Sequence, residues 1–161
     1  MTDVTDTPDQ RPAEAVLAFL RAAFPPEWRE PALGHEAVAA WEAENRVRLP
    51  EPYRTFVAEI GDGSGLGPAE DGGLQPLGRL PASWPDLGPR RPGEPLPPEE
   101  AWSWEDDETV VPEDPRIDAT YSHGSVVLGS DDGYSFWLLL TTGRHRGEVW
   151  MVGDVGAPRC P

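Results

Sequence analysis

The sequence predicts a domain of the α+β class, in which N-terminal helices pack on one face of a mainly antiparallel β-sheet. Through residues 12–60, apolar residues recur every three or four positions, as they do in helices that bury one face. Residues 125–152 instead contain short runs of β-branched and aromatic residues, separated by turns rich in Gly and Asp. Because these turns are short, successive strands should be antiparallel neighbours.

The first helix is expected to begin near Pro12 and to end before Pro25, because proline interrupts a helix interior. One apolar stripe is formed by residues that recur at three- and four-residue spacings, namely Val16, Leu17, Leu20 and Phe24. The preceding residues 1–10 are polar and are expected to be a disordered leader. Residues 11–161 are expected to form a single domain.

Two more helices are expected, one over about residues 34–45 and one over residues 50–60. Prolines near the start of the third helix are compatible with it, since the first amides of a helix have no partner within the helix. Solvent should surround Glu42 and Glu44 on the polar face of the second helix. The residues expected to face inward are Ala37, Val38, Trp41, Tyr53, Phe56, Val57 and Ile60.

The strands are expected at residues 125–128, 134–140 and 147–152, joined by turns at 131–133 and 143–147. Trp137 and Trp150 should lie in the core or beside it. Residues 74–77 could form a short edge strand at best, because Pro76 cannot donate a hydrogen bond to a neighbouring strand.

An insert rich in proline and acidic residues occupies about residues 81–120. Within it, Trp102 and Trp104 precede four consecutive acidic residues: Glu105, Asp106, Asp107 and Glu108. Tryptophan is enriched at binding hot spots, and neighbouring acids would attract a basic partner, so this segment is a candidate binding site. The alternative is that one tryptophan caps the open face of the sheet while the acids remain in solvent. Asp131 and Asp132, at a hairpin tip, are further candidates, with turn formation as their alternative role.

The net charge of −16 constrains the choice of partner. All basic residues other than histidine are arginines, and a surface this acidic repels nucleic acid and anionic membranes, so neither is an expected partner. It favours a basic protein, although the charge could also serve solubility alone. The chain lacks the features of a signal peptide, and its single cysteine, Cys160, cannot form an internal disulfide, so the cytoplasm is the expected location. The oligomeric state is left open.

No catalytic, metal or cofactor site is predicted. The serines lack the Gly-x-Ser-x-Gly nucleophile pattern, and His35, His123 and His145 lack the spacing of a zinc site. The glycine-rich residues 61–67 follow a helix, whereas phosphate-binding loops join a strand to a helix, so they are interpreted as a helix stop.

Several motifs together resemble the SUKH superfamily, which includes fungal cell-wall-synthesis regulators and bacterial immunity proteins. The first block runs from Val38 and Trp41 through Leu49–Phe56, Leu-Pro-Glu-Pro-Tyr-Arg-Thr-Phe, to Gly61-Asp62-Gly63. Residues 65–68 and 73–77 look like the variant common in actinobacteria, and so do residues 124–128, 138–143 and 146–150.

The resemblance implies a compact α+β fold without catalytic residues or a cofactor. It also implies an immunity protein that neutralises a cognate bacterial toxin by direct binding, and the acidity found independently would suit a basic toxin of the nuclease type. The alternative is a cytoplasmic regulatory interaction module unrelated to toxins.

Overall fold

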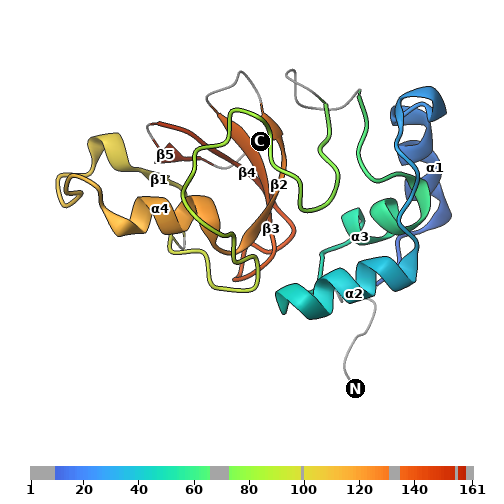
Figure 1. Ribbon diagram of the computed structural model, residues 1–161, viewed down its shortest axis with the longest axis horizontal. Helices are drawn as coiled ribbons and strands as arrows, with labels where there is room; N and C mark the ends of the chain where they lie inside the picture. The colour runs from blue at the N-terminus through green and yellow to red at the C-terminus, as the bar shows by residue number, and fades with distance from the viewer. Residues whose placement is uncertain (1–9, 66–72, 99, 131–134, 155, 159–161) are drawn as a thin grey trace.

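The computed structural model describes residues 10–65, 73–98, 100–130, 135–154 and 156–158, and it has a mixed α+β architecture (Figure 1). A central antiparallel sheet separates two helical regions. The N-terminal helices α1, α2 and α3 lie at one end of the molecule, and helix α4 lies at the other (Figure 1). The class predicted from the sequence, α+β with helices first and the sheet later, is confirmed.

The N-terminal region contains helix α1 (Glu14–Ala23), helix α2 (His35–Asn45) and the short helix α3 (Tyr53–Thr55). A single 3₁₀ turn, Pro26–Trp28, follows α1, and α3 continues directly into a π-helical turn at Phe56–Ile60. All three predicted helices are therefore present. The third starts three residues later than predicted.

Three details of these helices differ from the sequence prediction. Val16, part of the apolar stripe predicted for α1, is 40% exposed. Ala37 was expected to face inward but is exposed, and only Val38 of α2 is fully buried. Glu42 was expected in solvent, yet its side chain is only 11% exposed, because it accepts hydrogen bonds from the Arg54 guanidinium and from the Leu49 amide. A helical pattern alone could not reveal this partner, which lies beyond the end of the helix.

The main sheet is an antiparallel meander of β2 (Ser125–Ser130), β3 (Phe136–Leu140) and β4 (Val149–Val152), in the order β2-β3-β4. A bulge interrupts the β2–β3 register between Val127 and Gly129. All three strands were predicted, with boundaries that differ by up to two residues. The turn predicted at residues 131–133 lies outside the described residues.

Residues 74–77 do not form a regular strand. Leu74 makes one isolated bridge to Ser64, and the Gln75 amide donates to the carbonyl of Leu128 on the free edge of β2. A second, two-stranded sheet pairs β1 (Trp102–Ser103) with β5 (Gly156–Ala157), and this pairing was not predicted.

The side chains of β3 alternate between two hydrophobic cores, as the two-residue period of a strand requires. Trp137 and Leu139 face the first core, which contains the N-terminal helices. Phe136, Leu138 and Leu140 face the second core. The prediction that the N-terminal helices cover one face of the sheet is therefore confirmed, and the insert covers the other face.

Helix α4 (Pro115–Ser122) closes the second core and was not predicted. Its start combines two ordinary signals: Asp114 at the N-cap accepts a hydrogen bond from the Arg116 amide, and Pro115 occupies the first helical position. Its short length, its dense acidic surroundings and the prolines before it conceal the helical pattern in the sequence. None of the helices described is long and apolar enough to cross a membrane.

Candidate functional site

The predicted binding segment, residues 102–108, lies at the end of the molecule opposite α1 and α2, in the yellow part of the chain beside α4 (Figure 1). It contributes strand β1 and a 3₁₀ turn at Trp104–Asp106. The pairing of β1 with β5 attaches it to the chain that follows β4. The segment is therefore held by long-range contacts and belongs to the folded body.

Trp104 is a core residue. Its side chain is 7% exposed, its indole N–H donates to the Asp154 carbonyl at 2.7 Å, and its ring lies 6.3 Å from that of Tyr121. The interpretation that one tryptophan caps the otherwise open face of the sheet thus describes Trp104. Its buried ring offers little surface to a partner.

Trp102 is half-buried and serves to organise the acidic segment. Its ring lies edge-on to Trp104 at 5.3 Å, and its indole N–H donates to the Asp107 carboxylate at 2.8 Å. The Arg116 guanidinium stacks over the ring at 5.1 Å. A tryptophan in contact with an arginine and a carboxylate fixes the conformation of the loop around it.

The four consecutive acids fall into two pairs with different surroundings. Asp107 accepts hydrogen bonds from the side chain and amide of Thr109 and from Trp102, which together lower its pKa. Asp106 accepts from the Ser103 hydroxyl at 3.1 Å. Glu105 and Glu108 are exposed, and neither has a hydrogen bond or an ion pair within the described residues. Those two carboxylates are therefore available to a partner.

The acidic character extends beyond these four residues. Between residues 100 and 118 the chain carries eight acidic residues and one basic residue, Arg116. Arg116 is itself paired with Asp114 at 2.8 Å, and its hydrogen bonds hold the pKa of Asp114 well below the usual range. One end of the molecule thus carries a concentrated negative field, which we call the acidic end and define as residues 100–118. Asp131 and Asp132, the other predicted contacts, lie outside the described residues.

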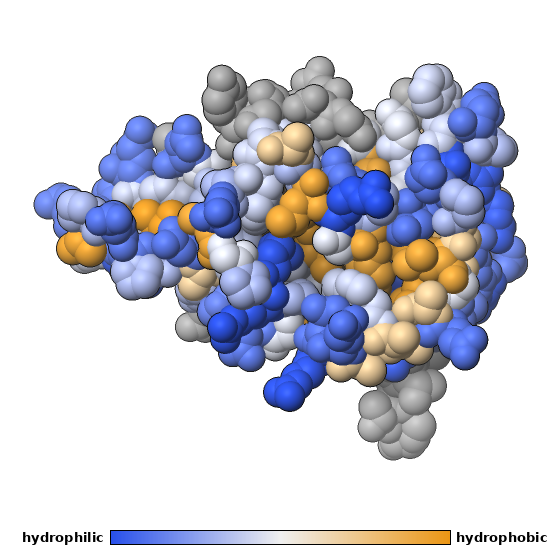
Figure 2. Space-filling model, in the orientation of Figure 1, coloured by the Kyte–Doolittle hydropathy of each residue, from blue (hydrophilic) through white to orange (hydrophobic). Residues whose placement is uncertain are grey.

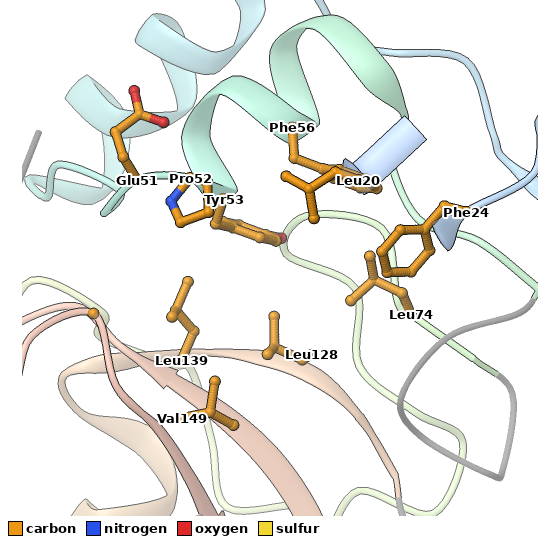
Figure 3. A pocket seen from close by; sticks show the side chains of 11 residues that line it. Leu20, Phe24, Glu51, Pro52, Tyr53, Phe56, Leu74, Leu128, Leu139 and Val149 are labelled. Carbon is orange, nitrogen blue, oxygen red and sulfur yellow. The ribbon is translucent and has the colours of Figure 1, made fainter. Parts of the chain in front are cut away.

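A second feature, not predicted from the sequence, is an apolar cavity of about 270 Å³ between the N-terminal helices and the sheet (Figure 3). Helix α1 contributes Leu20, and strands β3 and β4 contribute Leu139 and Val149. The ring of Tyr53 reaches into the cavity between these layers (Figure 3). From the sequence these residues are predicted only to be part of the core. The spacing of apolar residues along a helix or strand shows which side chains face inward, but it does not show how closely two opposing layers pack.

Two of the three histidines, His35 and His145, are engaged with carboxylates. His35 Nε2 lies 2.6 Å from Glu59, and His145 Nδ1 lies 2.8 Å from Glu148, with the His145 ring 5.5 Å from that of Trp150. In the part of the chain that is described, no group of three His, Cys, Asp or Glu side chains could hold a metal ion. Cys160 lies outside it.

Searches of protein-family models, curated proteins and solved structures return no match to this chain. Function is therefore inferred from the chain's own residues. Two features of the structure suggest a function. One is the acidic end, which contains Trp102 and the start of α4, and the other is the apolar cavity between the helices and the sheet, which the Tyr53 ring enters.

Proposed function

We propose that this chain is a non-catalytic protein-binding domain of the SUKH type that acts in the cytoplasm as an immunity protein. It would neutralise a basic bacterial toxin of the nuclease type by direct binding. The observation that carries the proposal is the acidic end, where Glu105 and Glu108 have no cationic partner within the described residues. The motif resemblance at Leu49–Phe56 supports the same conclusion independently of charge.

Binding at the acidic end would inhibit a nuclease by competing with its substrate. A nuclease recognises phosphates through clustered Lys and Arg, so its active-site cleft is positively charged. Carboxylates placed in that cleft pair with the same cations and exclude the nucleic acid. Complementary charge also accelerates the encounter between the two proteins, which suits an inhibitor that must act before its producer is damaged.

The architecture supports a role for the acidic end as a preorganised surface. Trp104 anchors the segment in the second core, and Trp102 with Asp107 fixes the loop that carries Glu105 and Glu108. A loop backbone that is already ordered loses little conformational entropy when a partner binds, so more of the interaction energy remains as affinity.

The test is rescue and binding with the basic toxin domains encoded beside the gene for this chain. The chain should protect cells that express one of these domains, and it should form a complex whose affinity falls as salt rises. Failure to rescue cells from every such domain, with no complex detected, would refute the immunity function. Retention of other cellular proteins would then favour the regulatory interaction module.

A charge-reversal pair maps the contact surface. The double variant Glu105→Lys, Glu108→Lys should weaken the complex at least about tenfold, mainly through slower association, since it places two cations against a basic partner. The matched control is Glu36→Lys, Glu44→Lys on the exposed face of α2, at the opposite end of the molecule, which changes the net charge by the same amount. Equal weakening by both double variants would show that net charge matters and that the acidic end is not the contact.

A further inference from the structure

The apolar cavity lies between two layers that are far apart in sequence. One wall comes from α1 and from the turn through Tyr53 and Phe56, and the other from β2, β3 and β4 (Figure 3). Phe56 and Leu139 are almost fully buried, at 3% and 6% exposure. Leu20 and Val149 are only partly buried, so the cavity communicates with the surface on their side. In the space-filling view, apolar residues reach the surface where the helices meet the sheet (Figure 2).

The lining is almost uniformly hydrophobic, and the cavity opens to the surface beside Leu20 and Val149, so its walls expose apolar area to water. Core side chains normally fill the space between layers, and each lost contact reduces stability. A cavity of roughly 150 Å³ with a comparable apolar lining stays free of water and admits benzene. At about 270 Å³, this cavity can hold a substituted aromatic ring or a short branched chain.

One polar group interrupts the hydrophobic lining. The hydroxyl of Tyr53 is directed into the cavity (Figure 3), and no hydrogen bond to it is made within the described residues. Burial raises the pKa of this phenol, with a smaller contribution from the charge of Asp62. The hydroxyl therefore stays neutral and can both donate to a ligand and accept from it. Tyr53 is only partly buried and its hydroxyl is not among the buried atoms that lack a partner, so a ligand would replace a hydrogen bond to water with one to itself.

The lining favours a neutral ligand. None of the described lining residues is a Lys, Arg or His that could pair with an anion, and a charge in this apolar site would lose its hydration without compensation. The Glu51 carboxylate points away from the cavity (Figure 3) and accepts hydrogen bonds from the amide and hydroxyl of Thr55 at 3.0 and 2.9 Å. The lining therefore combines shape for an apolar body with one neutral hydrogen-bonding group.

We propose that this cavity is a binding site for a small, neutral, predominantly apolar molecule with one hydroxyl group, of the phenol or short-chain alcohol class. The apolar body fills the space between the helices and the sheet, and the hydroxyl pairs with Tyr53. The site is separate from the acidic end, which lies beyond the sheet, so it does not depend on the proposed toxin-binding function.

The test uses three probes of similar shape: 4-methylphenol, toluene and 4-methylbenzoate. Binding to the full chain is measured by calorimetry and by ligand-observed NMR. We expect 4-methylphenol to bind most tightly, toluene more weakly, and 4-methylbenzoate weakest of all. Tyr53→Phe should weaken 4-methylphenol about fivefold and leave toluene unchanged, because it removes only the hydroxyl.

A cavity-filling variant provides the second arm. Val149→Phe should abolish binding of 4-methylphenol and toluene and raise the unfolding temperature, since the new ring occupies the void. Met151→Phe, on the same strand but outside the cavity lining, should leave both properties close to wild type. Saturable binding that survives Val149→Phe, or a wild-type chain that binds neither probe, would overturn the proposal. Self-association that Val149→Phe removes would assign the cavity to a second copy of the chain and would also overturn it.

Discussion

Replacing Trp104 with alanine should destabilise the fold, although the sequence suggests a residue on a binding surface. The indole is 7% exposed, packs against Tyr121 and Trp102, and donates to the Asp154 carbonyl. Truncating a buried tryptophan costs about 3–5 kcal/mol, which combines lost burial with the cavity left behind. Of this, the hydrogen bond from the Trp104 indole contributes only roughly 1 kcal/mol, because the Asp154 carbonyl can accept a hydrogen bond from water in the variant.

A loss of this size is large for a domain of 161 residues. Domains are typically stable by about 5–15 kcal/mol, so the variant should lose roughly a fifth or more of its free energy of unfolding. With about 2–4 °C per kcal/mol at this chain length, the unfolding temperature should fall by roughly 6–20 °C. Trp104→Phe keeps most of the ring packing and should show a smaller loss.

The assay is urea unfolding followed by far-ultraviolet circular dichroism, because a tryptophan variant changes the fluorescence signal itself. Glu105→Ala, one position along the chain and exposed, is the control and should stay within about 0.5 kcal/mol of wild type. If Trp104→Ala costs less than about 1 kcal/mol, the ring does not lie in a packed core and the reasoning fails.

Three further predictions concern partners that only the folded chain brings together. Glu42→Gln should lower the free energy of unfolding by about 1–3 kcal/mol in urea titrations, since it weakens the bonds to Arg54 and Leu49, whereas Glu44→Gln should change it by under about 0.5 kcal/mol. Gly124→Ala should cost about 1–3 kcal/mol by the same measurement, because this residue has φ +71° and an added Cβ would lie 2.6 Å from Thr142 Oγ1. A hydrogen bond from Arg11, followed by one from His35, lowers the pKa of Glu59 to about 2 from the ordinary 4.5. Its contribution to stability is therefore present above about pH 4.5 and lost as the pH falls toward about 2, so the urea midpoints of wild type and Glu59→Gln should converge over that window; a constant gap would contradict this assignment.

The elements that the sequence predicted are those set by local patterns. Helix α1 follows from an apolar stripe closed by Pro25, and the meander follows from alternating strands joined by glycine-containing turns. In each case the determining interactions lie within a few residues along the chain. The pairing of β1 with β5 could not be predicted, because it joins two-residue strands about fifty residues apart, and neither is long enough to show a period.

The candidate site was predicted only in part, for a related reason. Composition identified the acidic segment, but it could not show that Trp104 is buried while Glu105 is exposed. Neighbouring residues of the same segment differ in role because one faces the sheet and the other faces solvent. The cavity beside Tyr53 gave no signal in the sequence, since its volume depends on how two separate layers approach each other.

The sequence by itself determined the α+β class, the order of the N-terminal helices and the strands, and the strong negative charge of the chain. Only the tertiary structure decided that the insert covers the second face of the sheet, that Glu42 pairs with Arg54, and that the Tyr53 hydroxyl enters an apolar cavity. The physical reason is the range of the interactions. Hydrophobic period and turn chemistry act between near neighbours, whereas burial, ion pairing and cavity volume depend on segments that become neighbours only when the chain has folded.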